Sequence, residues 1–180
     1  MRIKSTFTKY LVCFLGAGIL LFACEMQEQR PPRAPSIPVT SGDFIRVEKS
    51  KGTLTVYHDS KLIKRYKIAL GSDPQGHKTC EGDGKTPEGL YHISTKNPQS
   101  RYHRSLKISY PNQKDRESAK ARGTSPGGDI MIHGLPKAFS WLGDTHILKN
   151  WTKGCVAVTN EEIEEIFDVI PVGTPIEIMP

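Results

Sequence analysis

Cysteine, tryptophan and long hydrophobic runs are scarce in this chain of 180 residues, which has four cysteines and two tryptophans. The N-terminal stretch without charge, Leu11 to Ala23, is 13 residues long. A helix needs about 20 apolar residues to cross a bilayer, so this stretch is too short to span one. The chain also lacks internal repeats and any block of Lys and Arg interleaved with aromatic residues. The absence of such a basic and aromatic block argues against nucleic-acid binding.

The N-terminus has the pattern of an export signal. Arg2, Lys4 and Lys9 precede the uncharged stretch, with no acidic residue among them, and a basic segment followed by a short apolar one is typical of secretion. The stretch ends in Leu-Phe-Ala-Cys, which resembles the lipobox of bacterial lipoproteins. This resemblance implies cleavage after residue 23 and a lipid on Cys24, although ordinary cleavage or an uncleaved anchor is an alternative. Cleavage there removes three basic residues and changes the formal net charge from +6 to +3.

The expected product is an exported protein at the periplasmic face of a membrane. The residue after Cys24 is Glu25 and not aspartate, which we interpret as allowing passage to the outer membrane. Residues 24–43 contain four prolines and few aliphatic residues, so they are expected to form an extended tether. The remaining residues, 44–180, are expected to fold as one domain by their length and to act as a monomer.

The pattern of this domain predicts a mainly β fold with short helices. Short segments rich in β-branched and aromatic residues, separated by turn residues, are typical of strands. Eight such segments are found: 44–50, 53–59, 62–70, 89–95, 106–110, 129–134, 155–159 and 174–179. The first three are expected to form a meander. Helices are expected at about 112–121, where the residues are polar, and at 160–170, where Thr159 and Glu162 have the spacing of a capping box.

Two cysteines lie in this domain, Cys80 and Cys155, and three functions are open to them. A disulfide between them is possible in an oxidising compartment. A metal site would combine Cys80 and Cys155 with His77 and His133, but the His-x-x-Cys spacing has no matching second pair and is a weak signal. The third possibility is that Cys155 is a nucleophile.

A nucleophile needs a base and a group that stabilises an oxyanion. His133 ends a predicted strand, and Gly134 after it permits close approach of the backbone. Gly154, directly before Cys155, permits consecutive N–H groups to converge on one point. A free thiol titrates at about 8.5, so we expect the imidazole of His133 to make Cys155 reactive near neutral pH.

These residues resemble a known family. The segments "MIHGL" (131–135) and "TKGCVAVTNEEIEEIFDVIPVGTPIEI" (152–178) resemble the catalytic signature of L,D-transpeptidases of the YkuD type, and "GDGKTPEGLYHI" (82–93) resembles an upstream segment of that family. The resemblance implies a mixed β-sandwich or barrel-like catalytic domain. Many members carry a histidine at the position of Lys153 and an arginine or asparagine at that of Ala157, two positions that flank the pocket expected for a second substrate.

The resemblance also implies the reaction. Cys155 would attack the peptidoglycan stem tetrapeptide between its third and fourth residues, release D-alanine and form a thioester that an amine resolves. His133 would act as base, oriented by the carbonyl of Gly134, and the N–H groups of Gly154 and Cys155 would hold the oxyanion. No cofactor and no metal is implied.

Five further residues are candidates for substrate binding, each with a structural alternative such as loop packing or exposure to solvent: Arg101, Tyr102, His146, Trp151 and Lys153. Three functional classes follow from the whole pattern. The first is a transpeptidase, and the second is a hydrolase that uses the same thioester with water as acceptor, trimming stems or releasing a wall-attached protein. The third, a non-catalytic wall-binding lipoprotein, is disfavoured by the intact His133 and Cys155. The sequence does not separate transfer from hydrolysis.

Overall fold

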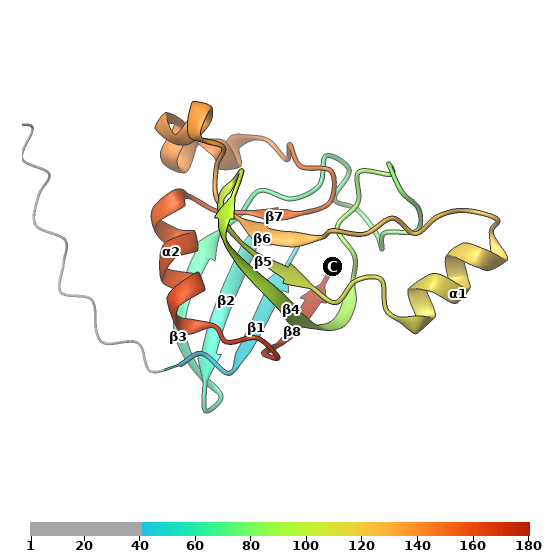
Figure 1. Ribbon diagram of the computed structural model, residues 1–180, viewed down its shortest axis with the longest axis horizontal. Coiled ribbons are helices and arrows are strands. Elements are labelled where there is room, and N and C mark those ends of the chain that lie inside the picture. The colour runs from blue at the N-terminus through green and yellow to red at the C-terminus, as the bar shows by residue number, and fades with distance from the viewer. Residues whose placement is uncertain (1–40) are drawn as a thin grey trace, which may run out of the picture. The chain divides into compact units, whose positions relative to one another are not determined.

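The first three strands form an antiparallel meander, as expected (Figure 1). The computed structural model describes residues 41–180, and within them β1 (Phe44–Glu48), β2 (Thr53–His58) and β3 (Lys61–Lys67) follow one another along the chain. Along β1 the side chains alternate between partly exposed and buried, with Ile45 and Val47 fully buried. Because successive side chains of a strand point to opposite faces, this alternation gives the sheet one core face.

Five more strands complete a sheet of eight. They are β4 (Gly89–Ser100), β5 (His103–Ile108), β6 (Met131–His133), β7 (Val156–Ala157) and β8 (Pro175–Met179). The strand order is β3-β2-β1-β8-β4-β5-β6-β7. The β1–β8 and β6–β7 pairs are parallel and the other pairs are antiparallel. The expectation of a mainly β fold with few short helices is confirmed.

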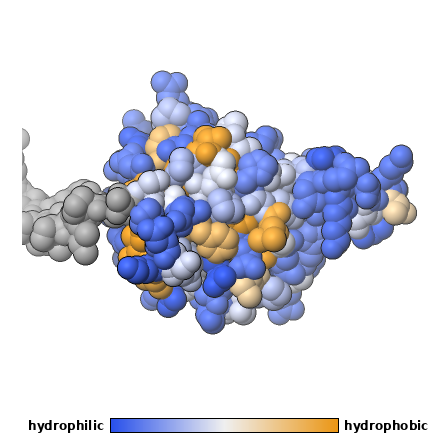
Figure 2. Space-filling view, turned by 90° about the horizontal axis from the view of Figure 1, so that it is seen from below, coloured by the Kyte–Doolittle hydropathy of each residue, from blue (hydrophilic) through white to orange (hydrophobic). Residues whose placement is uncertain are grey.

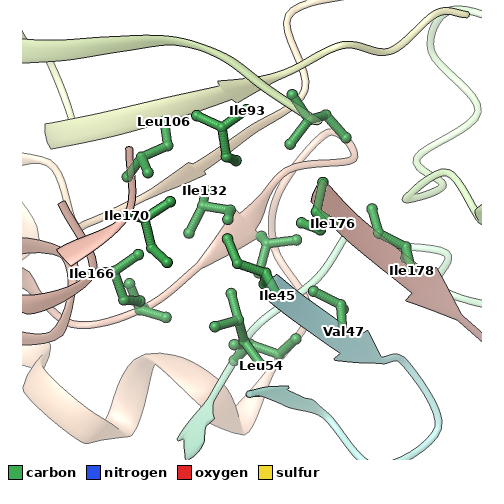
Figure 3. Packing of buried hydrophobic residues seen from close by; sticks show 14 of the residues in the cluster. Ile45, Val47, Leu54, Ile93, Leu106, Ile132, Ile166, Ile170, Ile176 and Ile178 are labelled. Atoms are coloured by element: carbon green, nitrogen blue, oxygen red, sulfur yellow. The ribbon is translucent and has the colours of Figure 1, made fainter. Parts of the chain in front are cut away.

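Aliphatic side chains from most strands and from one helix fill the core (Figure 3). Ile45 and Leu54 come from the meander, Ile132 from the far end of the sheet, and Ile166 from helix α2 (Asn160–Val169); each has 0% exposure. A buried aliphatic side chain contributes about 1.5–3 kcal/mol to stability. The core therefore holds β6, which ends at His133, and β7, which directly follows Cys155.

The helices agree with the sequence pattern in two of three cases. Helix α2 begins as the capping box predicts, with the Thr159 side chain accepting a hydrogen bond from the Glu162 N–H and the Glu162 carboxylate accepting one from the Thr159 N–H. Helix α1 (Gln113–Ala121) follows Asn112, which caps it. The 3-10 segment η1 (Lys137–Leu148), which is interrupted by a non-helical Gly143, was not expected.

The folded domain begins slightly before residue 44. Gly42 donates to the Val169 carbonyl at 2.8 Å and Asp43 to the Tyr57 carbonyl at 2.9 Å, so the last residues assigned to the tether belong to the domain. The predicted signal, Cys24 and the tether up to residue 40 lie outside the described residues and stay predictions. None of the helices in residues 41–180 combines the length and hydrophobicity needed to cross a membrane. Figure 2 shows one face of the domain as mostly hydrophilic, with hydrophobic residues in separate patches.

Candidate active site

The pairing of β6 with β7 brings His133 and Cys155 to the same face of the sheet. The two strands are parallel, with Ile132 beside Val156 and His133 beside Ala157. Ile132 and Val156 point into the core, so His133 and Ala157 point to the opposite face. Cys155 lies two residues before Ala157 and therefore shares that face. The register therefore puts the imidazole of His133 and the thiol of Cys155 on one face of the sheet.

The His133 ring is held in one orientation and in one protonation pattern. Its Nδ1 lies 2.7 Å from the carbonyl oxygen of Gly134, the partner that the resemblance implied. A carbonyl only accepts hydrogen bonds, so Nδ1 carries the proton and Nε2 is left with a free lone pair. The ring is 2% exposed and lies between Tyr102 and Trp151, with ring centroids 4.4 Å and 5.8 Å away.

Burial sets the charge of this base. It lowers the pKa of His133 to about 4, against the opposing effect of the hydrogen bond to Gly134, and the charge of Arg101 acts in the same direction as burial. His133 is therefore neutral at neutral pH, the form in which Nε2 can accept a proton.

The Cys155 thiol is half-buried and hydrogen-bonded to the backbone. Its Sγ lies 3.6 Å from the carbonyl of Asp129. Burial raises the pKa of Cys155, and the hydrogen bond from the Met131 backbone and the charge of Lys78 offset this only in part. The two shifts favour the neutral thiol of Cys155 and the neutral imidazole of His133. This differs from the expectation that His133 makes Cys155 a thiolate near neutral pH.

The turn before Cys155 is held by the Thr152 hydroxyl. This group donates to the Cys155 carbonyl at 2.8 Å and accepts from the Gly154 N–H at 3.1 Å. The Gly154 N–H, expected to hold the oxyanion, therefore already has a partner. Gly154 has φ +127°, and a Cβ there would come within 2.6 Å of the Lys85 carbonyl oxygen. Glycine is required at this position by both conformation and space.

The glycine-rich loop that contains Cys80 packs closely behind this turn. A Cβ on Gly71 would lie 2.0 Å from the Gly84 carbonyl oxygen and 3.1 Å from the Gly154 Cα. The loop is organised by Asp83, whose carboxylate accepts hydrogen bonds from the backbone of Thr79, Cys80 and Lys85 and from the Lys78 amine. Partial burial acts to raise the pKa of Asp83, but these donors lower it to about 2. The loop is therefore ordered by these hydrogen bonds and packs against the turn before Cys155.

The structure brings together three of the five residues expected to bind substrate. Tyr102, His146 and Trp151 line one cavity of about 460 Å³ beside the His133 ring. Arg101 is exposed and stacks on the Tyr102 ring, with its guanidinium 5.0 Å from the ring centroid. Lys153 is exposed on the turn before Gly154 and does not line the cavity.

The disulfide and metal interpretations do not fit the geometry. Cys80 and Cys155 are both free thiols. His77 accepts a hydrogen bond from the Glu88 N–H and lies 3.2 Å from an oxygen of Asp115, while His133 is bonded to Gly134. Within residues 41–180, the only group of His, Cys and acidic side chains close enough to share a metal is Asp43, His58 and Asp59. None of these three belongs to the metal site considered from the sequence.

Sequence reasoning missed two residues that position the site. The Asn160 side chain accepts a hydrogen bond from the Leu135 N–H at 2.7 Å, and a Cβ on Gly134 would lie 2.6 Å from the same oxygen. Thr152 fixes the turn before Cys155, as described above. An asparagine directly after the helix cap was visible in the sequence, but only the fold shows that it reaches the chain after His133.

A family model described as the L,D-transpeptidase catalytic domain, YkuD, matches residues 42–178, and this chain belongs to that family. YafK of Escherichia coli (strain K12), whose name as an L,D-transpeptidase is provisional, is 33% identical over 133 residues, which cover 71% of this chain and 46% of YafK. YqjB of Bacillus subtilis (strain 168), named in the same provisional way, is 29% identical over 142 residues, 76% of this chain and 71% of YqjB.

Among solved structures, the helical cell shape determining protein Pgp2 from Campylobacter jejuni superposes with a TM-score of 0.59 and 30% identity. The match covers 77% of this chain and 48% of Pgp2. This chain therefore spans about half the length of YafK and of Pgp2.

Proposed function

We propose that this chain is a cysteine-dependent L,D-transpeptidase that acts on peptidoglycan stem tetrapeptides. The observation that carries the proposal is the placement of Cys155 on the same sheet face as His133, whose Nδ1 is bonded to Gly134 so that Nε2 is free to accept a proton. Membership of the L,D-transpeptidase family supports the choice of substrate.

The proposed reaction has two halves. The Cys155 sulfur attacks the carbonyl that joins the third and fourth stem residues, and the thiol proton moves to His133 Nε2. That proton passes to the departing amine, the C–N bond breaks, D-alanine leaves and a thioester remains. In the second half an amine attacks the thioester carbonyl, a C–N bond forms as the C–S bond breaks, and the proton lost by the amine passes through His133 to the Cys155 sulfur. The N–H of Cys155 is our candidate for the oxyanion donor, because the Gly154 N–H is used by Thr152.

The neutral resting pair suits this scheme. Since burial holds His133 neutral and keeps the Cys155 proton on sulfur, proton transfer accompanies the attack on substrate instead of preceding it. A preformed ion pair is not needed, because His133 Nε2 is available as a general base at neutral pH.

For location we propose a lipoprotein anchored through Cys24 at the periplasmic face of the outer membrane, with residues 25–40 as spacer and with stem peptides as partners. The export signal and the Leu-Phe-Ala-Cys sequence support this. Pgp2 is named as a determinant of cell shape, and we extend to this chain a role in shaping the wall. Membrane fractionation of the wild type and of Cys24→Ala tests the anchor; a protein that fractionates identically in both forms argues against it.

The chemistry is tested by incubating the protein with purified wall fragments and reading the products by mass. We expect a tripeptide acyl group on Cys155, release of D-alanine and a crosslinked dimer. The Cys155→Ser variant should give none of these, whereas Cys80→Ser is the matched control and should give all three. D-Alanine release by Cys155→Ser would refute the proposal, and a shortened monomer without dimer would show hydrolysis in place of transfer.

A further inference from the structure

Asp129, two residues before β6, has a backbone conformation that is unfavourable for its residue type. Its φ is +54°, in the left-handed region where the Cβ of an L-residue comes too close to the following carbonyl oxygen. Within residues 41–180, four residues other than glycine have a positive φ, and Asp129 is the one of them that is hydrogen-bonded to Cys155. Strained backbone of this kind persists only where the surrounding structure holds it, and it is concentrated at functional sites.

The chain on both sides of Asp129 is held in place by backbone hydrogen bonds. Before it, the Ser125 carbonyl accepts a hydrogen bond from the Glu81 N–H at 2.8 Å. After it, the Ile130 carbonyl accepts one from the Ile108 N–H at 3.0 Å, and the Ile130 side chain is buried in the core. The left-handed conformation of Asp129 is therefore imposed by the fold around it.

This conformation directs the Asp129 carbonyl at the nucleophile. The carbonyl oxygen lies 3.6 Å from the Cys155 Sγ, and because a carbonyl only accepts hydrogen bonds, the thiol is the donor. Within the described residues the sulfur has no hydrogen bond to His133, the base of the proposed reaction. In the resting site the thiol proton therefore points to Asp129 and not to His133 Nε2.

Asp129 acts on the thiol through its charge as well. Burial is the main cause that raises the pKa of Cys155; the hydrogen bond from the Met131 backbone lowers it, the Asp129 carboxylate raises it, and Lys78 lowers it. The Lys107 amine lies 2.5 Å from the Asp129 carboxylate and offsets part of its negative charge. Replacements of Asp129 must therefore separate the effect of its charge from that of its carbonyl.

We infer that Asp129 is a positioning residue for Cys155: its left-handed backbone aims its carbonyl at the thiol and holds the sulfur in one orientation with its proton in place. Acylation then begins when the S–H group leaves the Asp129 carbonyl for His133 Nε2. The inference rests on the proposed function for the role of His133, but the hydrogen bond that it describes exists without substrate. A thiol held in this way is also less reactive at rest, because the thiolate is the nucleophilic form.

Three replacements in the full chain separate the carbonyl from the charge. Asp129→Gly, Asp129→Asn and Asp129→Val all remove the carboxylate. Glycine and asparagine accept a left-handed backbone, whereas a β-branched residue does not, so only valine should turn the carbonyl away from Cys155. A difference between the glycine and valine variants therefore reports the carbonyl alone.

The hydrogen bond can be observed in the infrared S–H stretching band, whose frequency falls when the S–H group donates a hydrogen bond. For each protein, subtracting the spectrum of the same protein with Cys155→Ser isolates the band of Cys155. We expect the band of the glycine and asparagine variants at the wild-type frequency and that of Asp129→Val at a higher one. Destabilisation of the fold alone does not produce this pattern.

The same variants should differ in thiol reactivity. At pH 7, iodoacetamide should label Cys155 about two- to tenfold faster in Asp129→Val than in Asp129→Gly, the effect of losing one neutral hydrogen bond to the protonated form. The mass of the peptide that contains Cys155 measures the rate. If Asp129→Val does not fold, Asp129→Ala takes its place, since alanine is less unfavourable than valine at a positive φ, and its rate should also exceed that of the glycine variant.

Ser60→Val is the matched control for backbone strain. Ser60 has a φ of +61° in the turn between β2 and β3, so valine there meets the same conformational conflict away from Cys155. We expect lower stability in this variant but an unchanged S–H band and an unchanged labelling rate of Cys155.

Equal band frequencies and equal labelling rates in the glycine and valine variants, or in the glycine and alanine variants, would overturn the inference whether or not D-alanine is released. A change of the band in Ser60→Val equal to that in Asp129→Val would also overturn it. If the expected differences are found but no D-alanine is released from a stem tetrapeptide, the positioning of Cys155 by Asp129 is supported and the proposed function is refuted. The two failures are therefore distinguishable.

Discussion

Burial keeps both Cys155 and His133 in their neutral forms. It raises the pKa of the thiol and lowers that of the imidazole to about 4. Both shifts therefore disfavour moving the proton from sulfur to nitrogen in the resting site. In the proposed reaction the proton therefore leaves the sulfur during the attack on substrate and not before it.

This gives a prediction for thiol labelling. The rate of alkylation of Cys155 by iodoacetamide should rise with a midpoint above pH 8.5, the ordinary value for cysteine, since burial holds the proton on sulfur. Mass spectrometry of the labelled protein at pH 6–10 measures it, with Cys80 in the same molecule as internal control. A midpoint below pH 7 would instead show that His133 makes Cys155 reactive near neutral pH, as expected from the sequence.

The buried His133 also predicts how stability depends on pH. Its pKa is about 4 in the folded chain and about 6.5 when unfolded, so protons bind more readily to the unfolded chain. Its contribution is fully present above pH 6.5 and is lost as the pH falls toward 4, by about 3 kcal/mol. Urea unfolding at pH 7, 5 and 4 should show a smaller loss for His133→Gln than for the wild type. Parallel losses in the two proteins would contradict the prediction.

Gly154 allows a matched test of the support behind the nucleophile. Gly154→Ala should lower the free energy of unfolding by about 1–3 kcal/mol, because its φ of +127° is unfavourable for alanine and its Cβ would meet the Lys85 carbonyl at 2.6 Å. Gly128→Ala is the control, since a Cβ there has nothing within 4 Å. Urea unfolding compares the two. Equal stability of both variants would mean that the turn and the loop move apart at little cost.

Helix α2 connects the core to the catalytic strand end. Its buried residues Ile163 and Ile166 lie in the core, and its first residue, Asn160, holds the Leu135 N–H just after His133 and Gly134. The start of α2 therefore helps to determine where His133 lies. Loosening the cap should affect both stability and the site.

We accordingly predict that Thr159→Ala lowers the free energy of unfolding by about 1 kcal/mol, the usual cost of losing an N-cap, because the Glu162 N–H loses its acceptor. Thr159→Ser keeps the hydroxyl and should retain most of that stability. Urea unfolding of the three proteins measures the difference. The prediction fails if alanine and serine are equally destabilising, since the loss would then come from packing of the methyl group.

Most elements could be predicted from local patterns, but the site depends on pairings that no local pattern contains. The meander and α2 follow from alternation, turn residues and a capping box, all of which act within about ten residues. The parallel pairing of β6 with β7 joins Ile132 to Val156, and only this register places Cys155 on the His133 face. The segment η1 was missed because its 3-10 turns and the non-helical Gly143 leave no 3.6-residue period to detect.

The conformation of the glycine-rich loop that contains Cys80 could not be predicted from local sequence either. A run rich in glycine is typical of a flexible loop, yet Gly71, Gly84 and Gly154 are in close contact. In this case glycine permits close packing of backbones rather than motion. A flexible loop and a closely packed loop can have the same glycine content. Which of the two forms depends on the segments that the fold packs against the loop.

Considered as a whole, the folded chain starts earlier than its composition suggests. Ser41, Gly42 and Asp43 resemble the polar tether in sequence, but Gly42 is buried against Ile170 and Val56, where a Cβ would come within 2.6 Å and 2.7 Å of their side chains. These residues extend the edge of the sheet core before β1 begins.

A comparison of two shortened chains tests this boundary. A chain that begins at Ser41 keeps the bonds from Gly42 to Val169 and from Asp43 to Tyr57, and the Asp43 carboxylate that accepts from the Asp59 N–H at 2.7 Å. A chain that begins at Phe44 loses all three. At about 1 kcal/mol for each hydrogen bond, the shorter chain should unfold with a free energy about 2–3 kcal/mol lower, measured by urea unfolding with an unchanged dependence on urea. If both chains have the same midpoint, residues 41–43 belong to the tether after all, and β1 is the true start of the domain.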